Sequence, residues 1–104
     1  MTSITDDNEK CLCVGGPLPA GVALPANGVA VGYTYRPEPF TNVPSITASY
    51  ERKSLTRQRK DGPETREFFV FDGEQDANSK VIRNGLSGDE ALDLTLKTPA
   101  LYWK

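Results

Sequence analysis

The sequence predicts an α+β fold: a small antiparallel β-meander of three to four strands, with one C-terminal helix packed on it and an extended Pro/Gly-rich N-terminal arm. Three observations lead to this prediction. Apolar and polar residues alternate between turn signals from residue 29 to residue 83, which is typical of short strands. An S-x-x-E capping box precedes a leucine-rich segment near the C-terminus. Six of the eight prolines lie before residue 45, where they disfavour a helix or an inner strand.

The arm is assigned to residues 1–28 and a single α+β domain to residues 29–104. Within the domain, VAVGYTY (residues 29–35) places valine and tyrosine on one face, which indicates a half-buried edge strand. Residues 45–58 and 67–71 are predicted to form a long hairpin, because turn-forming residues (KDGP) stand between them. The EFFVF segment is apolar on both faces and is therefore predicted to be central in the sheet. KVIR (residues 80–83) is the expected third strand of the meander.

The first strand of this hairpin changes its pattern half-way along. Ile46, Ala48 and Tyr50 alternate with polar residues, and Leu55 then appears on the opposite parity. Either a bulge near Lys53 re-aims the strand, or the basic half leaves the sheet.

The C-terminal helix is predicted from its start signal. Ser87 and Glu90 form the capping box, acidic residues occupy the first turn, and Pro99 marks the end. Leu92 and Leu96 share one helical face, although leucines 92, 94 and 96 also alternate as in a strand. The cap favours the helix.

Composition lowers the expectation of catalysis. The chain has 104 residues, a net charge of −2 and no histidine, so it lacks the commonest general base and transition-metal ligand. We therefore predict that the protein is not an enzyme and that it uses no cofactor and no metal. The N-terminus is acidic and no run of about 18 apolar residues occurs, which predicts an intracellular (cytoplasmic) or virion-associated protein without signal peptide or membrane span.

Two motifs resemble metal sites only superficially. Cys11 and Cys13 supply two ligands where structural zinc needs four, so we expect them to enter the core as small hydrophobic residues. DGEQDANSK (residues 72–80) has acids at alternate positions, but Ala77 stands where a calcium loop requires glycine and Arg83 where it requires a bidentate acid. We interpret it as a solvated acidic turn.

The strongest candidate for function is a basic run in an acidic chain. Residues 52–60 hold five cations without one acid, and the block of residues 45–66 is the only one with an excess of positive charge. Such a hairpin fits nucleic-acid phosphates, an acidic protein surface, or no ligand at all if it only keeps an exposed edge in solution. The candidate binding residues are Arg52, Lys53, Arg57, Arg59, Lys60 and Arg66.

The C-terminal Tyr102 and Trp103 complete the candidate site. Aromatic side chains of this size are costly to expose, so they either fold back onto the core or dock into a partner. Together these features favour a non-enzymatic protein–protein interaction module, of the small accessory, phage-type or complex-subunit kind, acting by assembly or inhibition. Its partner would be another protein or further copies of itself, and the alternative is a nucleic-acid-binding protein that uses the basic hairpin of residues 52–66.

Overall fold

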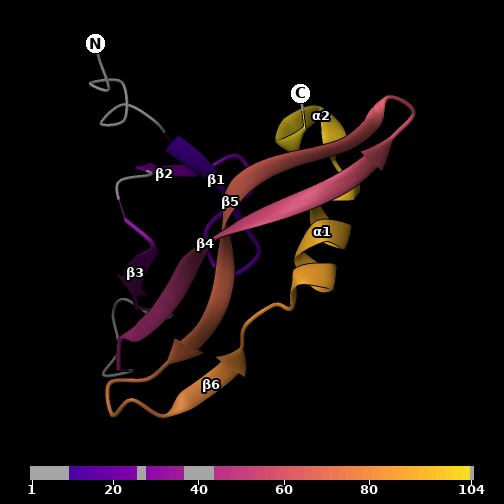
Figure 1. Ribbon diagram of the computed structural model, residues 1–104. Coiled ribbons are helices and arrows are strands. Elements are labelled where there is room, and N and C mark those ends of the chain that lie inside the picture. Colours follow the sequence, from indigo (N-terminus) through magenta and orange to yellow (C-terminus); the bar gives the residue numbers. More distant parts are fainter. Residues whose placement is uncertain (1–9, 26–27, 37–43, 104) are drawn as a thin grey trace.

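The computed structural model describes residues 10–25, 28–36 and 44–103. Strands take up 54% of the described residues, and helices only two short segments of them (Figure 1). The elements in chain order are β1 (Lys10–Val14), β2 (Ala23–Pro25), β3 (Ala30–Tyr35), β4 (Ile46–Arg59), β5 (Gly62–Gln75), β6 (Val81–Asn84), α1 (Gly88–Leu96) and α2 (Pro99–Tyr102).

The predicted fold class is wrong. Among the described residues, six strands form one mixed sheet in the order β2-β1-β5-β4-β3, with β6 also paired to β5, and the sheet curls into a half-barrel. The meander β4-β5-β6 exists, but it is only the middle of this larger sheet. What was predicted as an extended arm supplies β1 and β2, and β1 runs parallel to β5 through Cys13↔Phe69 and Val14↔Val70.

The parallel pairing explains why the prediction failed. β1 has five residues and β2 three, and the segment between them is rich in proline and glycine, so local pattern indicates a loop. Their pairing depends on β5, more than fifty residues away, whose free edge would otherwise expose backbone N–H and C=O groups. Tertiary contact therefore overrides the local signal of the arm.

β5 lies at the centre of the sheet, as predicted, and is buried on both faces. Phe68 and Val70 face a cluster formed with Leu55, Ala91 and the C-terminal aromatic residues. Phe69 and Phe71 face a second cluster, which contains Tyr50, Ala48 and both cysteines. The prediction that Cys11 and Cys13 enter the core is confirmed.

The irregularity in the long hairpin lies elsewhere than predicted. The β4–β5 register shifts between Ala48 and Tyr50, where two residues of β5, Asp72 and Gly73, stand opposite one of β4. β4 then continues without interruption to Arg59, so the basic half stays paired with β5. The position near Lys53 was wrong because the extra residue belongs to the partner strand, where Gly73 adopts a φ of 116°.

The capping box of α1 is confirmed. Ser87 Oγ accepts from the Glu90 N–H at 3.1 Å, and Glu90 Oε1 accepts from the Ser87 N–H at 2.9 Å. The helix ends at Leu96, and Pro99 does more than stop it, because it stands at the first position of α2. This second helix carries Tyr102 and Trp103 back onto the sheet, where 7% and 3% of their surfaces are exposed.

Candidate functional site

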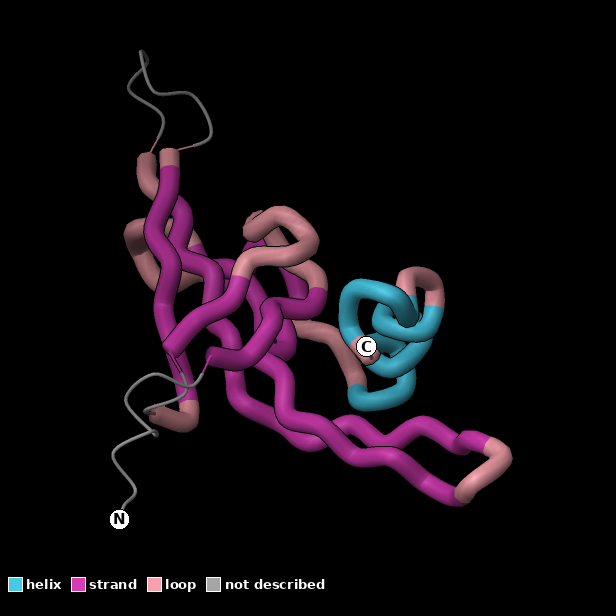
Figure 2. The backbone as a smooth tube through the Cα atoms, turned by 90° about the horizontal axis from the view of Figure 1, so that it is seen from above, coloured by secondary structure: helices cyan, strands magenta, loops and turns pink. Residues whose placement is uncertain are grey.

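The basic residues lie on the outer half of the β4–β5 hairpin. The Lys60-Asp61 loop joins Arg59 to Gly62, and the pairs from Lys53↔Phe68 outward have neither β3 nor β1 beside them. Figure 2 shows this half extending past the helices, with its loop at the far end. We call residues 51–67 the hairpin finger. It is the part of the described structure that extends farthest from the core.

Side-chain alternation divides the predicted site between two faces of the finger. The helix face, which α1 and α2 cover at its inner end, carries residues 53, 55, 57, 59, 64, 66 and 68. The open face carries residues 52, 54, 56, 58, 63, 65 and 67. Lys53, Arg57, Arg59 and Arg66 are therefore together on the helix face, whereas Arg52 is on the open face.

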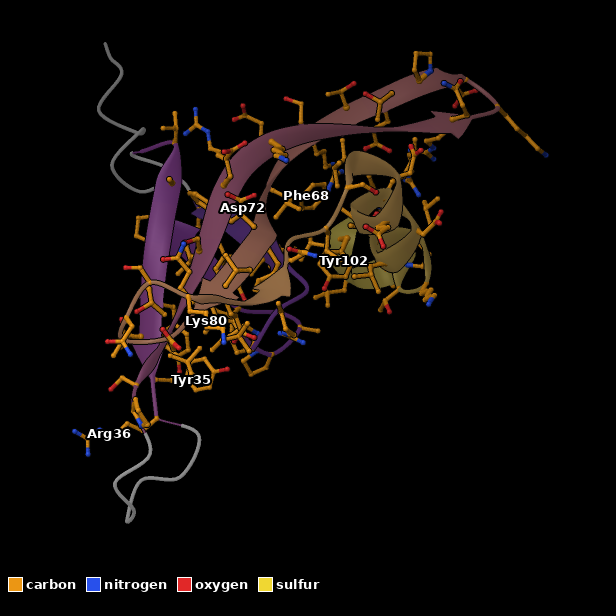
Figure 3. The ribbon with its side chains drawn as sticks, turned by 90° about the horizontal axis from the view of Figure 1, so that it is seen from below. Tyr35, Arg36, Phe68, Asp72, Lys80 and Tyr102 are labelled. Atoms are coloured by element: carbon orange, nitrogen blue, oxygen red, sulfur yellow. The ribbon has the colours of Figure 1, made fainter. Side chains whose placement is uncertain are left out.

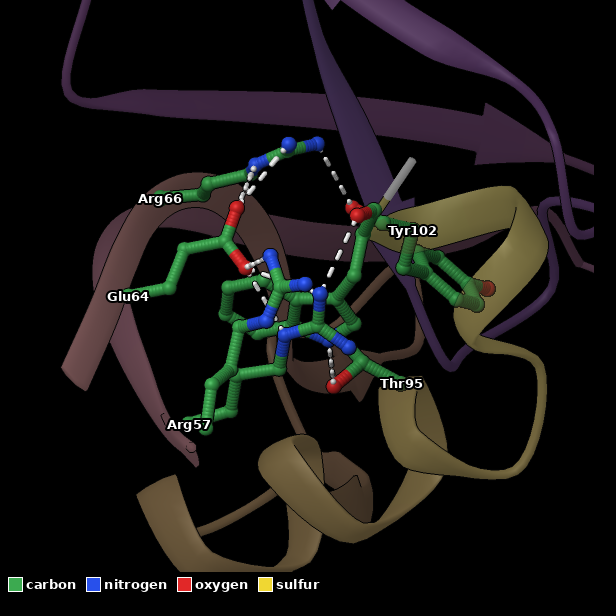
Figure 4. A network of polar contacts seen from close by, with 7 residues as sticks. Arg57, Glu64, Arg66, Thr95 and Tyr102 are labelled. Carbon is green, nitrogen blue, oxygen red and sulfur yellow. Dashed lines mark hydrogen bonds and ion pairs between the residues drawn. The ribbon is translucent and has the colours of Figure 1, made fainter. Parts of the chain in front are cut away.

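Glu64 binds three of the predicted arginines at once (Figure 4). Its Oε1 accepts from Arg57 Nε at 2.9 Å and lies 3.3 Å from Arg59 Nη1, while its Oε2 lies 3.0 Å from Arg66 Nη2. Arg57 and Arg66 also donate to the backbone carbonyls of Trp103 and Tyr102, at 3.3 and 3.4 Å. These two arginines join the finger to the C-terminus.

The indole of Trp103 completes this junction. The guanidinium carbons of Arg57 and Arg66 lie 4.9 and 5.9 Å from the ring centre, within the range of cation–π contact. Trp103 Nε1 donates to Thr95 Oγ1 at 2.9 Å, and the ring meets Phe68 edge to face. Of the two alternatives for Tyr102 and Trp103, return to the core is what the structure shows, so we leave both out of the exposed binding surface.

The other cations differ in their partners and in their exposure. Arg52 lies 3.4 Å from Glu67 on the open face, and Lys53 Nζ lies 3.8 Å from Glu51. The Arg59 side chain is 51% exposed. Lys60, in the loop, forms no ion pair with another residue of the described chain. Lys53, Arg59 and Lys60 are thus at least partly exposed to solvent, and Arg59 also binds Glu64, whereas Arg57 and Arg66 bind both Glu64 and the C-terminal carbonyls.

The Glu64 cluster predicts a pH-dependent stability. Hydrogen bonding from Arg57 holds the pKa of Glu64 below its ordinary value, so its contribution to folding is present at neutral pH and is lost as the pH falls through the lowered pKa. We expect the free energy of unfolding to decrease on acidification, and the decrease to be smaller in Glu64→Gln. Urea titrations at a series of acidic pH values measure this. Glu67→Gln, on the same strand, is the control, and an unchanged acid profile in Glu64→Gln would contradict the prediction.

A second polar cluster went unnoticed in the sequence. Glu74, 3% exposed, accepts from Arg83 Nε at 2.6 Å and from the Tyr35 hydroxyl, and the Arg83 guanidinium stacks on Phe71. The hydrogen bond to Glu74 raises the pKa of Tyr35. Figure 3 shows Tyr35 well away from Phe68 and Tyr102. The sequence pattern does not indicate this cluster, because its three residues come one each from β3, β5 and β6.

Two hollows accompany these clusters. One of about 210 Å³ lies beside Glu74 and is lined mainly by polar groups, including Ser49, Asp72 and Asn84. The other, about 320 Å³, lies between the loop after β1 and the two helices, and Cys13, Lys97 and Tyr102 line it. Burial raises the pKa of the Cys13 thiol to about 11, so this thiol stays protonated and unreactive at neutral pH.

Neither a cluster of metal ligands nor a membrane-spanning helix occurs among the described residues. No three Cys, Asp or Glu side chains among them gather as metal ligands, and the acidic loop is closed by its own chain, since Asp76 Oδ1 accepts from the N–H groups of Asn78 and Lys80. None of the helices in residues 10–25, 28–36 and 44–103 has the length and apolar character needed to span a bilayer. In comparisons with known proteins, no protein family, curated protein or solved structure matches the chain.

Proposed function

We propose that the protein is a non-enzymatic protein–protein interaction module whose hairpin finger docks on an acidic surface of another protein. It acts by assembly or inhibition, as an accessory or complex-subunit protein in the cytoplasm or in a virion. The observation that carries the proposal is that some cations of the finger hold its structure together while others are exposed. Arg57 and Arg66 fix the finger to the C-terminus, and this leaves Lys53, Arg59 and Lys60 exposed on an element held in place.

The carboxylates of the finger support a protein partner ahead of nucleic acid. The finger holds six basic and four acidic residues, and Glu64 lies among three of the arginines. A phosphate backbone lying on the helix face would meet Glu64 as a like charge, and one lying on the open face would meet Glu67. An acidic protein patch needs only two or three matching cations and can avoid these carboxylates.

The groups that line the hollow beside Glu74 support a function without catalysis. Its buried carboxylate already accepts from Arg83 and from Tyr35, so both oxygens have partners within the protein. The raised pKa of Tyr35 keeps its hydroxyl protonated at neutral pH, where it donates to Glu74 and is no base. The cluster thus serves to join β3 and β6 to β5.

Fluorescence anisotropy with two labelled probes tests this function. A polyglutamate peptide represents the acidic surface, and a duplex DNA represents the alternative ligand. We expect polyglutamate to bind at about 0.05 M salt, and the double variant Arg59→Gln/Lys60→Gln to weaken it about tenfold. The control Lys10→Gln/Lys80→Gln changes the net charge equally at exposed positions away from the finger.

Two results would oppose the proposal. Equal binding by wild type and the finger variant would mean that the finger is not the contact surface. DNA binding that is tighter than polyglutamate binding, falls steeply with salt and disappears in the finger variant would make nucleic-acid binding the function instead.

A further inference from the structure

Strand β4 has a free backbone edge beyond the point where β3 ends. The Arg52 N–H donates to the Val29 carbonyl at 2.8 Å and so points away from β5. Because N–H and C=O groups alternate in direction along an antiparallel pair, those of Ser54, Thr56 and Gln58 point the same way. In the described part of the chain no backbone group bonds to them there, and all three residues are exposed.

The opposite edge of the finger is less suited to pairing. By the same alternation, Pro63, Thr65 and Glu67 direct their backbone groups away from β4. Pro63 has no N–H to donate, and β1 takes over this edge of the sheet at Phe69. The two edges thus differ: β5 carries the residue that blocks strand pairing, and β4 carries none between Lys53 and Arg59.

The charges along the open edge select the kind of strand that fits it. Lys53 and Arg59, with side chains 36% and 51% exposed, lie on the helix face about 20 Å apart along β4. Leu55 and Arg57 lie between them on the same face, and uncharged Ser, Thr and Gln side chains occupy the other. A strand added here would place acidic residues opposite Lys53, Arg57 and Arg59, an apolar residue opposite Leu55, and small polar residues on the open face.

We propose that the finger binds its partner by strand addition: an extended acidic segment of the partner protein pairs with β4 along Ser54, Thr56 and Gln58. The inference rests on the proposed function and deepens it, because it names the bound segment and the backbone groups that hold it. Backbone hydrogen bonds supply affinity, and the cations supply selectivity for acidic side chains.

Charge disfavours a second copy of the chain at this edge. Two β4 edges paired antiparallel about Thr56 would bring Lys53 opposite Arg59 of the other copy twice. Like charges directly opposite each other destabilise a strand pair. The occupant is therefore a different, acidic chain.

Proline substitutions at matched positions test the proposal. Thr56 and Thr65 are cross-strand partners that share a side-chain hydrogen bond of 2.7 Å, and both direct their N–H outward. Thr56→Pro and Thr65→Pro each remove that bond and one outward N–H, so they differ only in the edge that they block. Gln58→Pro, opposite Pro63, is a second blocking variant nearer the loop, should Thr56→Pro fail to fold.

The probe is an end-blocked peptide, Glu-Thr-Glu-Thr-Val-Thr-Glu. Its binding is measured from the shifts of the backbone amide signals of the isotope-labelled protein in NMR spectra. We expect the amides of Ser54, Thr56 and Gln58 to shift and to exchange more slowly with solvent. Thr56→Pro or Gln58→Pro should weaken binding about tenfold, since lost hydrogen bonds and a steric block combine. Thr65→Pro should bind as wild type, and a peptide with Lys in place of Glu should bind about tenfold more weakly.

The outcomes separate this inference from the proposed function. Peptide binding that all proline variants retain, but that Arg59→Gln/Lys60→Gln loses, would overturn strand addition and leave side-chain docking of the finger intact. Loss of binding in Thr65→Pro alone would overturn the choice of edge. Absence of peptide shifts, together with failure of polyglutamate to bind, would overturn both. A wild type that self-associates through the same amides would replace the acidic partner with a second copy.

Discussion

Replacing Trp103 with alanine is expected to lower the free energy of unfolding by about 3–5 kcal/mol. Only 3% of the Trp103 surface is exposed, and its ring fills the space between Phe68 and the guanidinium groups of Arg57 and Arg66. The variant leaves a cavity, removes the donor to Thr95 Oγ1 and weakens the anchorage of both arginines. Urea unfolding followed by circular dichroism measures the loss, since Trp103 is the single tryptophan and fluorescence disappears with it.

Two controls separate the contributions of Trp103. Trp103→Phe keeps most of the ring packing and loses the hydrogen bond to Thr95, so its loss should be about 1–2 kcal/mol. Leu96→Ala removes a leucine that is 42% exposed on the same C-terminal segment, and its effect should stay below about 1 kcal/mol. A loss below about 1 kcal/mol in Trp103→Ala would mean that the C-terminal segment is not part of the cooperative core.

The elements that the sequence predicted correctly are those with local causes. The capping box of Ser87 and Glu90 satisfies backbone donors within four residues, and the Lys60-Asp61 loop lies between strands that pair with their immediate neighbours in the chain. The EFFVF run is apolar on both faces because β5 is buried on both faces. In each case the residues that specify the element also make its contacts.

The features that the sequence did not predict depend on distant partners. β1 is short and is followed at once by Gly15, Gly16 and Pro17, so it resembles a loop until β5 is placed beside it, and the pairing is parallel, which no hairpin signal can indicate. The bulge was assigned to β4 because Leu55 changes parity there, whereas the extra residue is in β5. The burial of Tyr50 also depends on distant residues. Its hydroxyl donates to Gly15 O and accepts from the Leu18 N–H, and both residues lie in the segment that was predicted to be an arm.

The candidate site was predicted as a set of positively charged residues. The structure shows that these residues differ in the groups that they bind. Spacing alone placed six positive residues near one loop, but it could not show that Glu64 faces Arg57 across the strands and that the C-terminal carbonyls accept from Arg57 and Arg66. Parity could have separated Arg52 from Lys53, because adjacent residues of a strand point to opposite faces. The fold-back of Tyr102 and Trp103 was one of two alternatives in the sequence, but the sequence could not show that Arg57 and Arg66 meet these residues there.

Gly16→Ala is the second substitution for which we expect a large effect, a loss of about 2–5 kcal/mol in the free energy of unfolding. Gly16 has a φ of 71°, in the left-handed region that a Cβ disfavours. A Cβ there would also stand 2.4 Å from the Tyr50 hydroxyl and 2.6 Å from Phe71 Cδ1. Both rings are buried, so neither can move aside without disturbing the cluster that holds β1 against β5.

Gly62→Ala separates backbone strain from packing at Gly16. Gly62 has a φ of 117°, and a Cβ added there meets no atom within 4 Å. Its substitution should therefore cost only the conformational strain, about 1–2 kcal/mol. The difference between the two variants in urea unfolding measures how tightly the segment after β1 packs on Tyr50 and Phe71. Equal losses would mean that this segment gives way at little cost, and that β1 and β2 contribute less to the stability of the sheet than their burial implies.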